Sequence, residues 1–399
     1  MKKLSYSILV VFTALLASSS SCDNEGGDPT PYDGITIESN ITENTTWETG
    51  NTYILTTRIS VEEGATLTIQ PGVVVKGEAG TGPNATALVI ARGATIDAQG
   101  SKDLPIIFTS IADEITPADI EAGNIESPNL DPDINGYWGG LIVLGKAKVS
   151  ASNDAGDVSE LAIEGIPTSD PNGLYGGNDD SDNSGILKYI SIRHGGSNIG
   201  AGNEINGLSL GGVGSGTTIE NIEVVANQDD GIEWFGGTVN VSNVVVWNVG
   251  DDGLDTDQSW AGTVDNFFVI TPAGHCFELD GPEGTYEAGH TIKDGTVIAS
   301  AADSEGEVAR AAKDLINVDE NSIVNLTNIH FTDIIDGQQV NRVTAEGVSF
   351  SEITFDVPAD SLVNHVNGDV PSGITAGGSP VASASELDWT WAAAAGVLK

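Results

Sequence analysis

Residues 218–234 read TIENIEVVANQDDGIEW, residues 240–257 read NVSNVVVWNVGDDGLDTD, and residues 263–280 read TVDNFFVITPAGHCFELD. Asn221, Asn243 and Asn266 take the same place in the three copies, at intervals of 22 and 23 residues. A period in the low twenties, built from short β-branched runs between Gly, Asn and Asp corners, is typical of a solenoid. Because no helical period separates the runs, each copy is predicted to be one coil of a parallel β-helix.

The repeat also predicts columns of acidic side chains. Successive strand residues point to opposite faces, so if Ile232, Leu254 and Phe277 fill the interior, the residues that follow them point outward. These following residues are Glu233, Asp255 and Glu278, and by the same parity Asp229, Asp251, Asp257 and Asp280 also face out. Coils stack about 4.8 Å apart, so the carboxylates come close together. Two such charges repel by about 3–4 kcal/mol at an effective dielectric of 20.

Something must offset this repulsion: a bound hard cation such as Ca²⁺, raised pKa values, or side chains that splay into solvent. We predict a calcium site on this acidic face, formed by Asp229, Glu233, Asp251, Asp255, Asp257 and Glu278. A weaker candidate is the loop Asp180-x-Asp182-x-Ser184, which matches the first half of an EF-hand calcium loop. The twelfth position of that loop is Ser191 where the motif has Glu.

The N-terminus has the pattern of a secretory signal over residues 1–21, with two lysines followed by a short apolar run. The signal ends at Cys22, which resembles the lipidated cysteine of bacterial lipoproteins. Asp23, Asn24 and Glu25 follow at once, as in lipoproteins that reach the cell surface. Residues 22–34 are rich in Gly, Pro and Asp and are expected to be a flexible tether. Ordinary secretion is the alternative.

The β pattern continues over residues 35–365, interrupted by acidic, irregular stretches at about 111–136 and 151–185. We therefore predict an all-β, single-stranded, right-handed parallel β-helix with insertion loops. Residues 366–399 are expected to form a linker and a short C-terminal helix that begins near an N-cap Ser385. This helix would close the open end of the solenoid, because solenoid ends need caps.

Composition narrows the range of partners. The 399-residue chain carries 58 acidic and 15 basic residues, for a net charge of −43. Such a charge disfavours binding to nucleic acid or to an anionic membrane surface. Glycine clusters lack the strand-to-helix context of a phosphate-binding loop, so no organic cofactor is expected. Cys276 alternates with inward positions and is expected to be a buried apolar side chain, while Trp260 in a loop is the candidate for stacking on a sugar.

Several motifs together resemble a family of surface lipoproteins of Bacteroidota. They are the Cys22 signal, GATLTIQPGVVVKG (64–77), YWGGLIVLG (137–145), IRHGG (192–196) and DWTW (388–391). The resemblance implies a right-handed parallel β-helix on the outer membrane, in most members without an assigned activity. Such lipoproteins often accompany TonB-dependent receptors, which implies nutrient capture or adhesion and a glycan, peptide or protein ligand.

A second resemblance is to polygalacturonase-type β-helix glycosidases. Asp229-Asp230, Asp251-Asp252, Gly274-His275 and Ile292-Lys293 keep the order of that family's catalytic segments. The resemblance implies a hydrolase in which one carboxyl group acts as acid and another as base. Gln228, Cys276 and Thr291 depart from the family pattern. Three alternatives stay open: a non-catalytic binding module, a hydrolase or lyase of uronic-acid glycans, and a structural spacer whose Asp-Gly pairs only turn the chain.

Overall fold

The computed structural model describes residues 33–199 and 204–398. The predicted signal peptide, Cys22 and nearly all of the predicted tether lie outside the described residues. Within them, no helix is long and apolar enough to cross a membrane.

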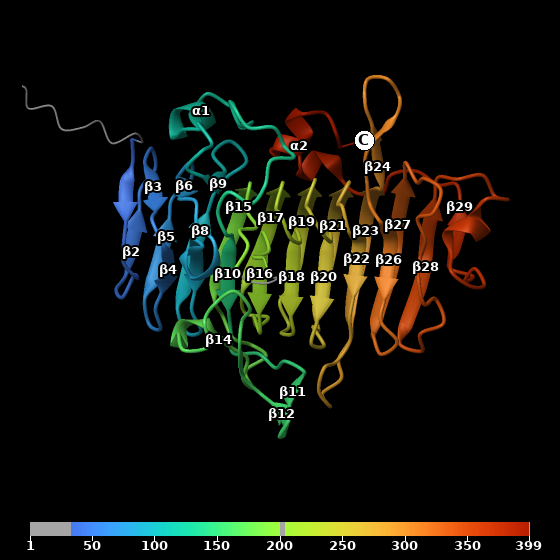
Figure 1. The fold of residues 1–399 in the computed structure, drawn as a ribbon, viewed down its shortest axis with the longest axis horizontal. Helices are drawn as coiled ribbons and strands as arrows, with labels where there is room; N and C mark the ends of the chain where they lie inside the picture. The colour runs from blue at the N-terminus through green and yellow to red at the C-terminus, as the bar shows by residue number, and fades with distance from the viewer. Residues whose placement is uncertain (1–32, 200–203, 399) are drawn as a thin grey trace, which may run out of the picture. The chain divides into compact units, whose positions relative to one another are not determined.

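Two parallel sheets form the solenoid (Figure 1). The larger has 15 strands: β1 (Ile35–Ile37), β2 (Thr45–Trp47), β3 (Thr52–Leu55), β5 (Thr66–Ile69), β6 (Val74–Gly77), β8 (Thr95–Gln99), β9 (Ile106–Ser110), β15 (Gly185–Arg193), β17 (Thr218–Val225), β19 (Val241–Trp247), β21 (Thr263–Ile270), β23 (His290–Ile298), β27 (Val324–Thr332), β28 (Val348–Phe355) and β29 (Ile374–Ala376). The smaller has eight: β4 (Arg58–Val61), β7 (Ala87–Ile90), β10 (Leu141–Leu144), β16 (Leu208–Gly211), β18 (Ile232–Phe235), β20 (Leu254–Asp257), β22 (His275–Leu279) and β26 (Asp314–Val318).

The remaining elements lie in connections and excursions. They are the antiparallel pairs β11 (Ala151–Asn153) with β12 (Gly156–Val158), β13 (Leu161–Ala162) with β14 (Leu174–Tyr175) and β24 (Ser300–Ala302) with β25 (Val308–Ala311), the helices α1 (Pro117–Glu121) and α2 (Trp391–Ala394), and the 3₁₀ turns η1 (Gly82–Asn84), η2 (Pro171–Gly173), η3 (Leu362–His365) and η4 (Ala384–Glu386).

Each coil of the repeat places one strand in each sheet, as a parallel β-helix requires. Strand β19 pairs with β17 and β21, while β20 pairs with β18 and β22. The predicted register is confirmed, because Ile232 lies opposite Leu254 and Leu254 opposite Phe277. All three side chains are fully buried in the interior. The all-β, parallel β-helix architecture predicted from the repeat is therefore the one observed.

The long strands of the larger sheet bend at one residue in the left-handed conformation. Before β15 each coil uses two separate strands, and β15 joins the two lines by pairing with both β8 and β9. From there on the bend falls at Tyr189, Asn221, Asn243, Asn266, Asp294, Asn328 and Glu352, all with positive φ. Asn and Asp adopt this conformation more readily than other non-glycine residues. The recurring asparagines of the sequence therefore mark where each strand changes direction.

The C-terminal segment is placed differently from the prediction. Strand β29 still pairs with β28, so the solenoid extends beyond residue 365. The helix α2 has Thr390, not Ser385, as its N-cap, and Ser385 lies in the turn η4. Leu387, Trp391 and Ala392 pack on outward-facing side chains of β17, β19, β21 and β23, so the helix covers a side of the solenoid and does not close its end (Figure 1).

The reason for this placement lies in the outer face of the larger sheet. Val225, Trp247, Ile270 and Ile298 form an apolar column there, on consecutive strands. This apolar surface must be covered, and the apolar residues of the C-terminal segment cover part of it.

Candidate functional site

The acidic row lies on the outer face of the smaller sheet. Its central column pairs Glu233 with Asp255 and Asp255 with Glu278, so the predicted alignment of these carboxylates is observed. The column continues to Ser209 on one side and to Asn317 on the other. Asn206 Nδ2 donates to Glu233, and Asn317 Nδ2 donates to Glu278 over 2.9 Å. We refer to Asp229, Asp230, Glu233, Asp251, Asp252, Asp255, His275 and Glu278 as the acidic row.

The second insertion determines where the acidic row begins. Earlier in the same column stand Val89 and Ile142, and Ile142 pairs in register with Val89 on one side and with Ser209 on the other. These two apolar residues pack under Ile163, Ile166 and Tyr175 of the insertion. The column changes from apolar to acidic where this apolar cover ends. The insertion thus forms one wall beside the carboxylates.

Two groups in the row consist of carboxylates alone. Asp229, Asp230 and Asp251 have ligand oxygens within 4.8 Å of one another, and so do Asp230, Glu233 and Asp255. Asp230 belongs to both groups. Its Oδ1 also accepts a hydrogen bond from the backbone N–H of Asp252 over 2.9 Å. No lysine or arginine of the described chain forms an ion pair with any of these five residues.

The third group contains a histidine. His275 Nδ1 lies 3.1 Å from Asp252 Oδ1 and 3.7 Å from Glu278 Oε2. The backbone N–H of His275 also donates to Asp252. Burial lowers the pKa of His275, but the two carboxylates outweigh burial and raise that pKa to about 10. The imidazolium in turn holds the pKa of Glu278 well below its usual range.

Most carboxylates of the row have raised pKa values, mainly because they are buried and to a smaller extent because they repel one another. Only 6% of Asp230, 7% of Glu233 and 2% of Asp252 is exposed, so these side chains do not splay into solvent. Burial raises the pKa of Asp230, Glu233 and Asp255 well above their ordinary values, and neighbouring carboxylates add to the effect. Burial likewise raises the pKa of Asp229 and of Asp252 to about 7. At neutral pH the row therefore holds protons that a cation could displace.

Comparison with known families agrees with this architecture. A model of the pectate-lyase-like β-helix domain matches residues 39–373. The chain belongs to this pectate-lyase-like β-helix family. No curated protein matches it. Membership in the family fits a role in acting on or binding polysaccharide, and does not by itself distinguish the two.

Two predicted members of the site lie elsewhere in this β-helix. Lys293 is on β23 in the other sheet, where its Nζ lies 2.7 Å from Asp265 and 3.0 Å from Asp294. Trp260 is 1% exposed and stacks on Trp234 inside the solenoid, with ring centroids 4.7 Å apart. Its indole N–H donates to the Val239 carbonyl over 3.0 Å. The prediction that Trp260 offers a face to a sugar is therefore wrong, because its side chain turns into the core from an exterior loop.

The predicted calcium ligands are only partly brought together. Asp257 pairs with Phe235 and joins none of the three groups within the described chain, although burial raises its pKa to about 7. The EF-hand-like loop is not assembled either. Asp180 forms an ion pair with Lys148 at 2.5 Å, and Asp182 accepts from Ser184 at 3.4 Å. Because the Asp180 carboxylate is already paired with the amine of Lys148, it is not free to bind a metal cation.

Some residues of the site were missed in the sequence. Asn317 follows a long excursion, and only extending the register of Glu278 by one more coil would have found it. Glu164 and Glu204 add negative charge beside Asp229 and raise its pKa further. They come from outside the repeat, so no periodic signal points to them.

Proposed function

We propose that the chain is a surface lipoprotein whose acidic row binds Ca²⁺ and, through the bound cation, a glycan. The observation that carries this proposal is the pair of carboxylate groups that share Asp230 without any ion-paired lysine or arginine in the described chain. Calcium takes six to eight oxygen ligands and tolerates irregular geometry, which suits carboxylates supplied by stacked strands. The group of Asp252, His275 and Glu278 suits Ca²⁺ less, because a histidine nitrogen replaces an oxygen.

Calorimetric titration with Ca²⁺ at pH 7.5 tests the cation site. We expect saturable binding and a melting temperature that falls by several degrees on chelation, because a ligand that binds only the folded state stabilises it. Asp255→Asn removes one negative charge from the second group and should weaken binding by at least tenfold. Asp154→Asn, which changes an exposed acid of the second insertion, should bind like the wild type. Equal affinity in both variants would contradict the assignment.

We also propose membrane attachment through a lipid on Cys22, supported by the signal pattern of residues 1–21. In this proposal the following residues tether the β-helix outside the outer membrane, beside a TonB-dependent receptor. Cys22→Ser should move the protein from the membrane fraction to the soluble fraction of the cells that produce it. Retention of the variant in the membrane would contradict a lipid anchor.

A second candidate function is hydrolysis or elimination in a uronic-acid glycan. It is favoured by Asp229 and Asp252, whose pKa of about 7 suits an acid or a base at neutral pH. Arg193 and Lys293, which a lyase could have used as the base, both lie away from the row, since Arg193 pairs with the buried Glu223. Incubation with pectins and alginates decides between the two functions. If the protein cleaves one of these glycans and Asp252→Asn abolishes the cleavage, the enzyme function is favoured. If the protein binds a glycan without cleaving it, the function of binding a glycan through Ca²⁺ is favoured.

A further inference from the structure

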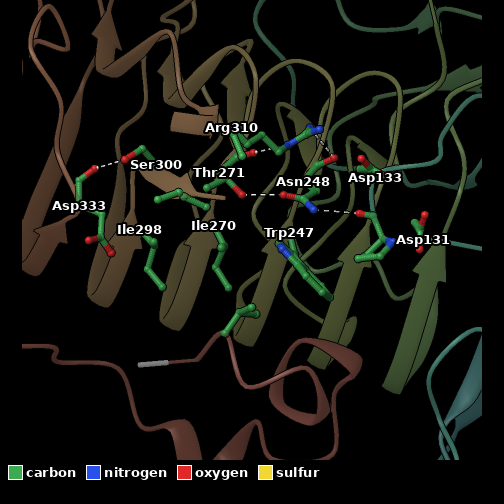
Figure 2. A pocket seen from close by; sticks show the side chains of 15 residues that line it. Asp131, Asp133, Trp247, Asn248, Ile270, Thr271, Ile298, Ser300, Arg310 and Asp333 are labelled. Carbon is green, nitrogen blue, oxygen red and sulfur yellow. Dashed lines mark hydrogen bonds between the residues drawn. The ribbon is translucent and has the colours of Figure 1, made fainter. Parts of the chain in front are cut away.

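A cavity of about 680 Å³ lies over the ends of three strands of the larger sheet, whereas the acidic row lies on the smaller sheet. Its floor is the apolar column Trp247, Ile270 and Ile298, whose side chains point into the space in Figure 2. This volume is typical of pockets that hold a ligand or an anchor side chain. The C-terminal segment covers part of the same column, and Val397 is its one described residue in the wall of the cavity.

The walls are held in place by hydrogen bonds between segments far apart in the sequence. Asn248 Nδ2 donates to the Pro132 carbonyl of the first insertion over 3.0 Å. Arg310, on the β24–β25 hairpin, donates through Nε to the Thr271 carbonyl over 3.1 Å and through Nη2 to the Asn248 carbonyl over 2.8 Å (Figure 2). The cavity is therefore formed before any ligand arrives, which lowers the entropic cost of binding.

The rim of the cavity is acidic. Asp131, Asp133 and Asp333 line it with exposed side chains, and none of them forms an ion pair with a cation of the described chain. Among the described residues of the lining, Arg310 is the one that carries a positive charge, and it directs its hydrogen bonds to backbone carbonyls. The tip of the adjacent hairpin adds exposed Asp303, Glu305 and Glu307.

The hairpin also offers exposed apolar surface beside this rim. Val308 is 54% exposed, and Ala301, Ala302 and Ala309 line the cavity with exposed side chains. An apolar pocket within a ring of unpaired charges of one sign is the arrangement of an interface hot spot. The sign of the charges decides the chemistry of the partner: an anionic glycan would be repelled here, and a basic segment attracted.

We propose that this cavity binds a partner protein through a segment in which an aromatic or aliphatic anchor is flanked by lysine or arginine. The anchor side chain fills the space above Trp247, Ile270 and Ile298. The flanking cations lie against Asp131 and Asp133 on one side and Asp333 on the other. This site shares no residue with the acidic row and does not require Ca²⁺. The proposal can therefore be tested independently of the function proposed above.

Fluorescence anisotropy with a dye-labelled pentapeptide, tryptophan at its centre and lysine at the other four positions, tests the proposal in the presence of EDTA. Ala309→Trp fills the cavity without changing charge and should weaken binding by at least tenfold. Asp131→Asn with Asp133→Asn should weaken it by about three- to tenfold, the effect of two exposed charge pairs. Circular dichroism of each variant checks that it folds.

The matched control neutralises two exposed acids far along the chain, Glu38→Gln with Glu43→Gln, and should bind like the wild type. A second peptide with glycine in place of tryptophan should bind at least tenfold more weakly. Wild-type affinity in Ala309→Trp, an equal loss in the control variant, or equal affinity for the glycine peptide would each overturn the proposal. Those results would mean that the peptide responds only to the net charge of the protein.

Discussion

At the scale of single residues, three asparagines show how a side chain sets the geometry of a coil. Asn221, Asn243 and Asn266 have φ of 59°, 58° and 55°, in the left-handed region. Asn266 Nδ2 donates to Asn243 Oδ1 over 2.8 Å, so the residues also hold neighbouring coils together. The same side chain therefore tolerates the bend and links the stack.

Asn243 offers a test of these two roles. Asn243→Ala places in the left-handed region a residue that tolerates it less well than asparagine, and it removes the hydrogen bond, so we expect a loss of about 1–2 kcal/mol in the free energy of unfolding. Asn243→Gly loses only the hydrogen bond, because glycine adopts positive φ without strain. Guanidinium unfolding of both variants should show the smaller loss for glycine. Equal losses would mean that alanine adopts the left-handed conformation at this bend as easily as glycine does.

At the scale of elements, the C-terminal segment acts as a strap across the larger sheet. The backbone N–H groups of Val381 and Ala382 each donate to Thr296 Oγ1 over 3.0 Å. Farther along, the Ala392 N–H donates to Glu223 Oε1 over 2.9 Å. The guanidinium carbon of Arg193 lies 4.9 Å from the centre of the Trp391 ring. The sequence motifs at 192–196 and 388–391 are thus in contact, which gives a physical reason for their occurring together.

Replacing Trp391 should detach the C-terminal segment from the larger sheet. Trp391 is 4% exposed, and Trp391→Ala at such a site costs about 3–5 kcal/mol. Because the segment packs on one side of the sheet, we expect the loss to be local. Hydrogen exchange should accelerate at Ala392 while strand β28 stays protected. Val363→Ala, at a site 62% exposed, is the control. Faster exchange in β28 and β29 would instead indicate that the segment caps the end of the solenoid.

At the scale of the whole molecule, the net charge of −43 makes stability depend on protons and cations. Much of this charge is spread over the surface, where water and salt screen it. The acidic row is different, because its carboxylates are buried and adjacent on stacked strands. The pKa values of about 7 at Asp229, Asp252 and Asp257 show that folding itself raises their affinity for protons.

The sign of the resulting pH dependence follows from linkage. These pKa values lie above the ordinary 3.8, so the folded state binds more protons than the unfolded state between pH 4 and 7. Without a cation, the free energy of unfolding should therefore fall as pH rises from 5 to 7. It should keep falling above pH 7, because the pKa of His275 is raised to about 10 and the folded state still holds that proton. With Ca²⁺ the stabilisation should be largest above pH 7, because protons compete with the cation below it. Melting temperatures from pH 5 to 8.5, in EDTA and in Ca²⁺, measure both trends. A melting temperature in EDTA that rises over this range would contradict the linkage.

The repeat of residues 218–280 was enough to predict the coils, their register and the alignment of Glu233, Asp255 and Glu278. A regular stack turns spacing along the chain into spacing in space, so local periodicity determines these features. Within the repeat, the prediction failed for Asp257, which joins none of the three groups in the described chain. The other wrong predictions concern residues outside that periodicity. Trp260 and the C-terminal helix lie in irregular segments, and the direction in which such segments turn has no counterpart in the repeat.

Which segments cover the outer faces of the two sheets could be seen only in the tertiary structure. Asn248 meets Pro132 across 116 residues and Ala392 meets Glu223 across 169, and contacts at such separations leave no periodic trace in one sequence. The contact of Asn248 with Pro132 helps to build the cavity over Trp247, and the packing of the second insertion on Val89 and Ile142 forms the wall beside the acidic row. Burial, which raises the carboxylate pKa values, and enclosure, which makes a pocket, both depend on which segments pack together, and that is a property of the tertiary structure.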